Sequence, residues 1–224
     1  MKKLVAVIPV RAGSQRVKDK NVRPFAGKSL LEHKLEIVKQ LPVEEIIVNT
    51  DSEEAIEIAL KAGVSFHRRE PYYASSKCSN SEFHHYLAEV TEAENLLIAQ
   101  VTAPLIFKES YEKAINAFYQ KKCDSLMSVK VLKEFIWFNG EPLNYSIDKT
   151  PNSQDLPEYI VPTFGLVIVK RDAMLETKSY IGKNPYFHKV TQEEAIDIDT
   201  ELDFDFAEFM FKKIFQNQKN GDLV

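Results

Sequence analysis

The sequence predicts an α/β protein with a mostly parallel central sheet flanked by helices, organised as a single domain over residues 1–224. Short apolar runs rich in β-branched residues, typical of buried strands, alternate with segments of helical apolar spacing. Strands separated by helices of this length are joined by right-handed crossovers, which place helices on both faces of the sheet. A chain of 224 residues, 44% of them hydrophobic, is long enough to bury one substantial core.

The first half of the chain supplies the opening strands and helices. Residues 4–10 form an apolar, largely β-branched run that predicts a buried strand. Residues 30–39 and 53–62 carry apolar residues at helical spacing, and Gly63 ends the second helix because glycine readily adopts the left-handed conformation. Short apolar runs predict two further strands, at 45–49 and 64–67.

The second half continues the alternation. Apolar spacing predicts helices at 81–92 and 109–121, and apolar runs predict strands at 95–100, 125–131 and 166–170. A final helix is expected at 202–215. Four of its residues share one face that we expect to be buried: Leu202, Phe206, Phe209 and Ile214.

Residues 132–161 interrupt this rhythm. They contain Trp137, Tyr145 and Tyr159 among polar turn residues and show no clear helix. Aromatic residues in a segment that the sheet does not need favour a dimerisation arm or a flap over the site, inserted into the single domain. A well-packed hairpin is the alternative. We expect a homodimer built on this segment.

Composition and charge narrow the classes of partner. The net charge of −4 argues against a general nucleic-acid binder, and no apolar run approaches the roughly 20 residues of a membrane span. The apolar run at 4–10 is not followed by a small-residue cleavage site, so we expect a cytoplasmic protein. Cys78 and Cys123 show neither C-x-x-C spacing nor nearby histidines and are interpreted as structural thiols.

A basic loop directly follows the first strand. Residues 11–21 contain Arg11, Arg16, Lys18 and Lys20 around Gly13 and Ser14. Open α/β sheets bind ligands at the carboxyl ends of their strands, where main-chain N–H groups and cationic side chains can hold a polyphosphate. A solvated charged turn is the alternative. The position after the first strand favours the phosphate site.

Two better-known phosphate motifs are absent. Gly27-Lys28-Ser29 resembles the end of a Walker A motif, but Val22 stands where that motif needs a glycine. Gly13 does not begin the G-x-G-x-x-G fingerprint of dinucleotide-binding proteins.

An acidic pair lies just before the last predicted helix. Alternation with Ile196 and Ile198 points Asp197 and Asp199 to one side, which spaces two carboxylates for a hard cation such as Mg²⁺. Helix capping by Asp199 is the alternative, but Thr200 and the acidic residue three positions later already form a capping sequence. Basic loop and acidic pair together predict a nucleoside triphosphate, magnesium and a reaction at phosphorus.

These motifs, with others between them, resemble the acylneuraminate cytidylyltransferase family, which makes CMP-sialic acid and its relatives. The matching stretches run nearly end to end in the family's order: Arg11 with Ser14, Lys20-Asn21, Gly27-Lys28, Asn49-Thr50-Asp51-Ser52, Gln100 to Leu105, Gln154 to Pro157, and Asp197 to Glu201. The resemblance implies a Rossmann-like nucleotidyltransferase fold, homodimerisation through the middle segment, CTP as donor and Mg²⁺ as cofactor.

The resemblance also implies roles for individual residues. Catalysis would fall to Arg11, Lys20 and Asp199, and the metal to Asp197 and Asp199. Nucleotide contacts would come from Arg11, Ala12, Gly13, Ser14, Lys20, Asn21 (at the cytosine), Arg69 and Asn80, with Arg68 as an alternative to Arg69. Acceptor contacts would come from Gln100, Thr102, Gln154 and Phe164.

The departures from the family fall on the acceptor side. Sialic acid enzymes carry arginine where this chain has Ile106 and Ser153, and Arg-Pro-Asn-Gly where it has Pro162-Thr163-Phe164-Gly165. Gln15 also replaces a lysine of the basic loop, with Arg16 as its compensation. Arginine binds carboxylates in a bidentate fork, so we expect a more apolar acceptor site and poor use of N-acetylneuraminic acid.

The sequence therefore predicts a cytidylyltransferase that transfers CMP from CTP to a small acidic, sialic-acid-like sugar and releases pyrophosphate. No side chain stands out as the general base. An acceptor such as another ulosonic acid or a phosphonate is the alternative, as is a nucleotide-binding protein without catalysis. A glycosyltransferase is disfavoured because its D-x-D motif would follow a central strand, near Gln100.

Overall fold

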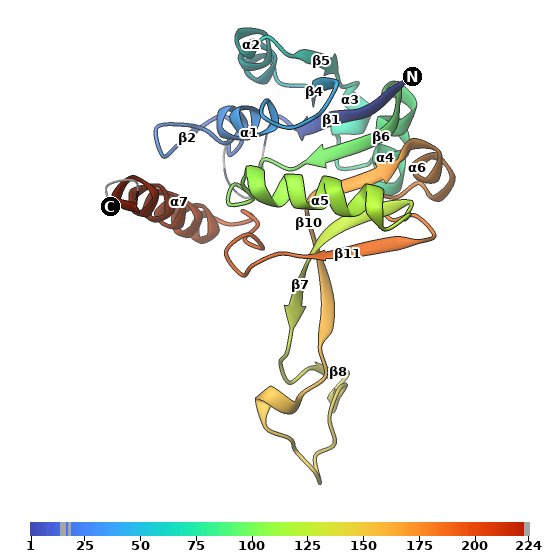
Figure 1. Ribbon diagram of the computed structural model, residues 1–224, viewed down its shortest axis with the longest axis vertical. Helices are drawn as coiled ribbons and strands as arrows, with labels where there is room; N and C mark the ends of the chain where they lie inside the picture. The colour runs from blue at the N-terminus through green and yellow to red at the C-terminus, as the bar shows by residue number, and fades with distance from the viewer. Residues whose placement is uncertain (14–16, 18, 222–224) are drawn as a thin grey trace.

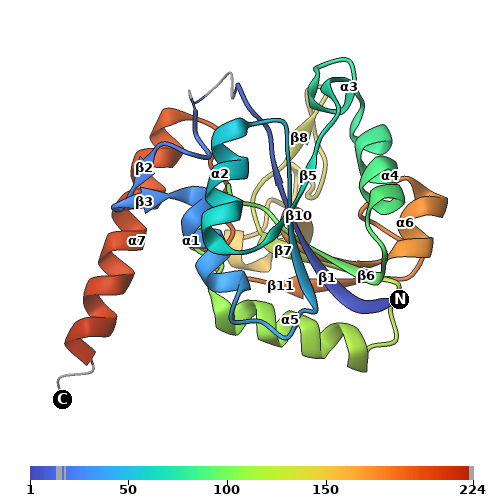
Figure 2. The same cartoon turned by 90° about the horizontal axis from the view of Figure 1, so that it is seen from above.

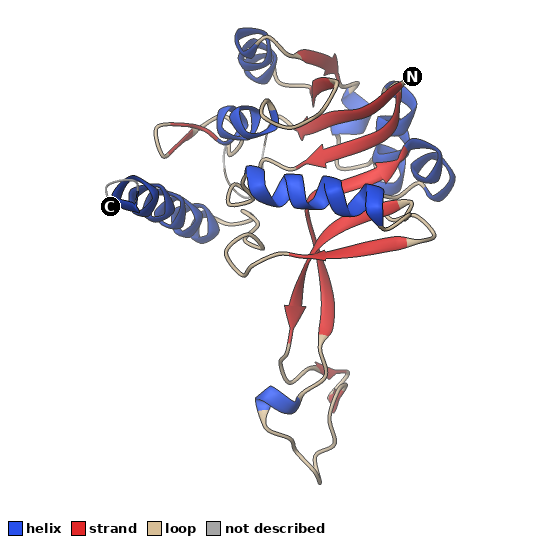
Figure 3. Cartoon of the chain, in the orientation of Figure 1, coloured by secondary structure: helices blue, strands red, loops and turns tan. Residues whose placement is uncertain are grey.

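The computed structural model describes residues 1–13, 17 and 19–221 and is built on a seven-stranded sheet. The sheet strands are β1 (Lys2–Val10), β4 (Glu45–Thr50), β5 (Ser65–Arg68), β6 (Ala93–Ala99), β7 (Ser125–Leu132), β10 (Tyr159–Lys170) and β11 (Pro185–Lys189). Their order is β11-β7-β10-β6-β1-β4-β5, and β10 runs antiparallel to both of its neighbours, β6 and β7. The other pairings described within this sheet are parallel, which confirms the predicted mostly parallel α/β fold (Figure 3).

The five predicted helices are present with small shifts at their ends. They are α1 (Leu30–Val38), α2 (Glu53–Ala62), α4 (Asn80–Val90), α5 (Lys108–Gln120) and α7 (Glu201–Gly221). Several elements were not predicted from the sequence, among them the short α3 (Pro71–Ala74), α6 (Arg171–Thr177) and the edge strand β11. Among the described residues, no helix combines the length and apolar character needed to cross a bilayer.

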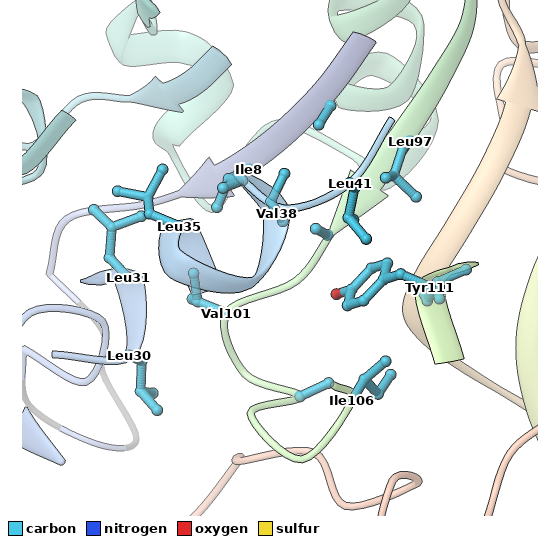
Figure 4. Close-up of a cluster of buried hydrophobic side chains, with 14 of the residues drawn as sticks. Ile8, Leu30, Leu31, Leu35, Val38, Leu41, Leu97, Val101, Ile106 and Tyr111 are labelled. Carbon is cyan, nitrogen blue, oxygen red and sulfur yellow. The ribbon is translucent and has the colours of Figure 1, made fainter. Parts of the chain in front are cut away.

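The core lies in two layers, one on each face of the sheet, because side chains alternate along each strand. On β1, Ala6 and Ile8 pack with α1, α2, α5 and α7, whereas Val5 and Val7 pack with α4 and α6. Figure 2 shows these two sets of helices on opposite sides of the strands. Figure 4 shows part of the first layer, where Leu31, Leu35 and Val38 of α1 approach Ile8 of β1.

The Gly27-Lys28-Ser29 stretch serves the start of α1. It belongs to a small hairpin of β2 (Pro24–Phe25) and β3 (Lys28–Ser29), turned at Gly27 with φ of +91°. Ser29 then caps α1 in a capping box, accepting from the N–H of Glu32 while the Glu32 carboxylate accepts from the N–H of Ser29. The stretch that resembles a Walker motif therefore has a local structural role, which requires no bound phosphate.

The prediction for the buried face of the last helix was wrong for three of its four residues. Leu202, Phe206 and Phe209 are 78%, 50% and 60% exposed. Only Ile214 packs against the core, beside a different stripe formed by Phe204, Ala207 and Phe211. The reason lies in the β2–β3 hairpin, because the ring of Phe25 lies 5.4 Å from that of Phe204 and 5.3 Å from that of Phe211, measured between centroids.

Residues 132–161 form an arm that extends from the sheet (Figure 1). The ribbon of β7 and β10 leads into it, followed by β8 (Trp137–Phe138), β9 (Glu141–Pro142) and the 3-10 turn η1 (Ser153–Asp155). β8 and β9 pair as a hairpin, whereas the alternative interpretation expected a well-packed one. The hairpin is not well packed, since Trp137 and Phe138 are 52% and 65% exposed.

Candidate active site

The predicted site residues gather where the parallel strands end. Arg11 follows β1, Asp51 follows β4, Arg69 follows β5 and Gln100 follows β6. Because these strands are parallel neighbours, their carboxyl ends lie along one edge of the sheet. The basic loop and Gln100, one of the predicted acceptor residues, therefore share this edge.

The basic loop is held against β4 by main-chain contacts. The N–H of Ala12 donates to Oδ1 of Asp51 at 2.8 Å, and Gly13 adopts a φ of +63°, which suits glycine. The exposed Arg11 lies at the mouth of a small hollow of about 60 Å³, which is also lined by Ala12, Gly13, Asn21, Ser52 and Glu54. Ser14, Gln15, Arg16 and Lys18 lie outside the described residues.

Asn21 lies beside this loop, and only one of the two polar atoms of its side chain makes a hydrogen bond among the described residues. Its Nδ2 donates to the main-chain oxygen of Arg11 at 3.1 Å. Its Oδ1 is buried and has no hydrogen-bond partner among the described residues. A buried acceptor without a partner costs about 1–3 kcal/mol, so a donor on a ligand would be favoured here.

Residues near the beginning of the chain contact residues that precede the last helix. The ammonium group of Lys20 donates to the main-chain oxygen of Ile198, which stands between Asp197 and Asp199. The N–H of Ile198 in turn donates to the main-chain oxygen of Thr102 at 2.9 Å. The structure thus brings the basic loop, the acidic pair and the turn after β6 together.

The acidic pair has the predicted alternation. Ile198 is fully buried, whereas Asp197 is exposed and Asp199 is half-buried. Asp203 caps α7 as expected, because its carboxylate accepts from the N–H of Thr200 at 2.8 Å and from the N–H of Asp199 at 3.2 Å. The hydroxyl of Thr200 is the largest cause that lowers the pKa of Asp203.

The donor set fits a magnesium ion shared with a substrate. No group of three or more His, Cys, Asp or Glu that could hold a metal occurs among the described residues. Mg²⁺ in nucleotide enzymes is held by one or two carboxylates, and substrate phosphates and water complete its coordination. Asp197 and Asp199 match that requirement.

Arg69 is a buried cation built into the site. It is 5% exposed, and its Nε and Nη2 donate to the side-chain and main-chain oxygens of Asn49 at 2.7 and 2.8 Å. Burial lowers the pKa of Arg69 to about 10, while Asp51 acts in the opposite direction. The guanidinium also lies 4.4 Å from the ring centroid of Phe83 in α4. Arg68, the alternative, pairs on the surface with Glu53.

The start of α4 lies beside this arginine. Asn80 is the first residue of the helix and is exposed. The neighbouring Ser79 is committed to capping, because its hydroxyl accepts from the N–H of Glu82 at 3.2 Å. Of the two, Asn80 has the side chain that a ligand would reach.

The turn after β6 packs tightly against a bulge in β10. The N–H of Gln100 donates to the main-chain oxygen of Gly165 at 3.1 Å, and a Cβ on Gly165 would lie 2.6 Å from that of Ala103. Phe164 is half-buried with a φ of +55°, a left-handed conformation rare for an aromatic residue. Such strain concentrates at functional sites.

Two expectations on the acceptor side need correction. Ile106 is fully buried in the core, so it does not line the site in this structure. Gln154 lies in η1 of the arm, which extends from the sheet, and the structure does not bring it to Gln100 and Thr102 of the same chain (Figure 1). Sequence order alone could not reveal that the arm leads away.

Asn49 and Asp51 were not among the predicted site residues, yet each holds a residue of the site in place. Asn49 holds Arg69, and Asp51 holds Ala12. Both belong to the stretch Asn49-Thr50-Asp51-Ser52 at the carboxyl end of β4, and that position was the available signal.

The fold and the site define a nucleotide-binding α/β protein of the nucleotidyltransferase class. The chain belongs to the cytidylyltransferase family, whose family model matches residues 5–220. The predicted family membership is confirmed.

Individual relatives have low sequence identity to this chain, but they match it over nearly its whole length. The chain is 27% identical over 227 residues to post-translational flagellin modification protein B of Campylobacter coli, covering 95% of this chain and 97% of that protein. It is 25% identical over 224 residues to pseudaminic acid cytidylyltransferase of Campylobacter jejuni, covering 94% and 97%. It is 28% identical over 234 residues to N-acylneuraminate cytidylyltransferase of Escherichia coli, covering 99% of this chain but 54% of that protein. The chain thus spans about half the length of that N-acylneuraminate relative.

Solved structures share the fold. CMP:2-keto-3-deoxy-manno-octonic acid synthetase complexed with CTP superposes with a TM-score of 0.68 at 16% identity, covering 94% of this chain and 99% of that chain. A 4-diphosphocytidyl-2C-methyl-D-erythritol synthase from Anaerococcus prevotii gives a TM-score of 0.69 at 16% identity, with the same coverage. Identities this low bear on the fold alone.

Proposed function

We propose that this enzyme transfers CMP from CTP to a modified nonulosonic acid, with release of pyrophosphate. The hydroxyl oxygen of the acceptor attacks the α-phosphorus, and the bond from this phosphorus to the oxygen that bridges it to the β-phosphate breaks. Pyrophosphate leaves with the electron pair of that bond, and the hydroxyl proton passes to water. The observation that carries the proposal is the hydrogen bond from Lys20 to Ile198, because it joins the basic loop to the acidic pair at the carboxyl edge of the sheet.

The charges at this edge suit phosphoryl transfer. Arg11 and Lys20 would neutralise the β- and γ-phosphates. Asp197 and Asp199 would hold the metal. Magnesium bound there would supply positive charge to the phosphate oxygens and lower the pKa of the acceptor hydroxyl.

The buried polar groups nearby suit a cytidine. The Oδ1 of Asn21, which has no partner among the described residues, can accept a hydrogen bond from the exocyclic amino group of cytosine. Arg69 is anchored by Asn49 and lies beside α4, where Asn80 is exposed and can contact the ribose. The basic loop would cover the triphosphate, Ser14 included.

The acceptor proposed is a modified nonulosonic acid such as pseudaminic acid, in preference to N-acetylneuraminic acid. Gln100 and Thr102 are proposed to contact the acceptor, and Phe164 precedes Gly165, whose main-chain oxygen accepts from the N–H of Gln100. Sialic acid enzymes carry a polar residue where this chain has the ring of Phe164. A less hydroxylated sugar acid loses less by desolvation against such a ring.

The proposal includes a homodimer formed through the arm. Phe135, Trp137, Phe138, Leu143 and Ile147 are all exposed there, more apolar surface than an isolated arm would favour. A hollow of about 820 Å³ opens between the base of the arm and α7, lined by Leu132, Asp197 and Phe206 among others. A second copy seated there would cover both surfaces and would bring its own Gln154 toward the acceptor.

The decisive experiment measures pyrophosphate release from each nucleoside triphosphate with several acceptors in parallel. The acceptors are pseudaminic acid, N-acetylneuraminic acid, 2-keto-3-deoxy-manno-octonic acid and a small phosphonate. We expect release with CTP and magnesium, fastest with pseudaminic acid. Efficient use of N-acetylneuraminic acid would overturn the acceptor assignment, and binding of CTP without release for any acceptor would favour a non-catalytic nucleotide-binding protein.

A further inference from the structure

Lys34 is a lysine in the middle of the core. It occupies the buried stripe of α1 together with Leu30, Leu31, Leu35 and Val38, and it is only 1% exposed. Burial lowers its pKa to about 7. A buried amine is costly unless its hydrogen bonds are satisfied, so the contacts of this side chain matter.

The amine has two polar partners, and neither is a carboxylate. Its Nζ lies 2.9 Å from the main-chain oxygen of Ala103 and 3.0 Å from the hydroxyl oxygen of Tyr111 in α5. Tyr111 is itself fully buried. In Figure 4 its hydroxyl oxygen points from α5 toward α1 and the chain segment that carries Val101 and Ile106. The amine thus lies where α1, α5 and that segment meet.

The bond to Ala103 is one of three that locate the turn after β6. Gln100 donates its N–H to Gly165 of β10, and the oxygen of Thr102 accepts from the N–H of Ile198. Lys34 holds the next carbonyl, that of Ala103, from α1. The turn is therefore fixed by three separate parts of the fold, and the lysine is the only side chain among these three donors.

We propose that Lys34 is a positioning residue for the acceptor, which acts by holding the Ala103 carbonyl so that Gln100 and Thr102 face the sugar acid. The inference rests on the proposed function, which gives these two residues to the acceptor. A charged group that only filled the core would be replaced by leucine or methionine at little cost, because an apolar side chain avoids desolvation. The lysine is kept for its bond to the turn.

The test compares Lys34→Met with the matched control Tyr111→Phe. Both remove a hydrogen bond from the same buried cluster, but only the first takes the Lys34 donor from the Ala103 carbonyl, which then keeps, among the described residues, only the local N–H of Ile106 at 3.4 Å. We expect Lys34→Met to raise the KM for the acceptor about tenfold or more and the KM for CTP less than about twofold. Tyr111→Phe should leave both close to wild type. Hydrogen–deuterium exchange should accelerate over residues 100–106 in Lys34→Met alone.

The double variant Lys34→Met/Tyr111→Phe keeps the proposal testable if Lys34→Met folds poorly. Replacing both partners by apolar groups of similar shape restores the packing. Recovery of stability with a KM for the acceptor that stays high supports positioning; recovery of both overturns it. Unchanged KM values in Lys34→Met overturn this inference alone, whereas a wild-type enzyme that transfers CMP to no sugar acid overturns the proposed function.

Discussion

The ammonium group of Lys20 donates a hydrogen bond to the main-chain oxygen of Ile198, a residue 178 positions further along the chain. The contact ties the basic loop after β1 to the peptide that separates Asp197 from Asp199. Lys20 also contributes to the lowered pKa of Asp203, which caps the helix that follows. The basic loop and the acidic pair are thus joined by a direct contact.

Asp199→Asn should lower turnover at least about a hundredfold, because a neutral amide is a weaker magnesium ligand than a carboxylate. Pyrophosphate release titrated with magnesium measures the effect. Asp205→Asn, at an exposed position of the same helix, is the matched control and should leave the magnesium dependence unchanged. Near wild-type release by Asp199→Asn at limiting magnesium would refute the metal assignment.

Lys20→Ala and Arg11→Ala should each lower kcat/KM for CTP by about ten- to a thousandfold, since each removes one cation from the polyphosphate. Steady-state kinetics with varied CTP gives the ratio. Lys28→Ala is the control within the Walker-like stretch, because Lys28 pairs with Glu36 on the surface and should be dispensable. If Lys20→Ala and Lys28→Ala behave alike, the loop is not the triphosphate site.

Trp137→Asp should shift the protein toward monomer in light scattering at micromolar concentration, because a charge in an apolar interface is left without a partner. Leu60→Asp, on α2 and also exposed, places the same charge on an apolar site outside the arm and should leave the mass unchanged. A wild-type protein that is already monomeric would end the dimer hypothesis.

Phe164→Asn and Phe164→Thr both remove the ring, but only asparagine suits the left-handed conformation at φ of +55°. We therefore expect the asparagine variant to be about 1 kcal/mol more stable than the threonine variant in thermal unfolding. Both should lose the preference for the modified sugar acid over N-acetylneuraminic acid. An unchanged preference in both variants would show that the ring does not contact the acceptor.

His84 makes folding stability sensitive to acid. Burial lowers its pKa from 6.5 to about 4, and its ring stacks on Tyr180 with centroids 3.6 Å apart. Between these values the unfolded chain binds the proton and the folded chain does not, so stability falls as the pH drops from 6.5 toward 4. His84→Phe should remove about 1–2 kcal/mol of that loss in denaturant unfolding. If the free energy of unfolding depends on pH in the same way in wild type and variant, His84 is not the cause of the acid sensitivity.

Most of the secondary structure could be predicted from sequence signals between residues close together in the chain. Gly63 ends α2 with a φ of +68°, and Thr200 and Asp203 form the predicted cap, because capping depends on atoms three or four residues apart. The basic loop and the acidic pair were also visible, since each concentrates one charge within a few residues. The sequence by itself therefore determined the main strands and helices, and with them which residues were candidates for the site.

Tertiary structure decided what depends on distant partners. The last helix carries two apolar stripes, and only the docking of Phe25 on Phe204 and Phe211 selects the buried one. β10 runs antiparallel to its neighbours. It is also longer than expected, because the bulge at 162–167 hides the alternating pattern of its first residues. Lys34 is buried because α5 and the turn after β6 pack against it, and both lie far from it in the sequence. Side-chain spacing encodes which faces are apolar, but the free energy of packing between distant segments decides which of those faces are buried.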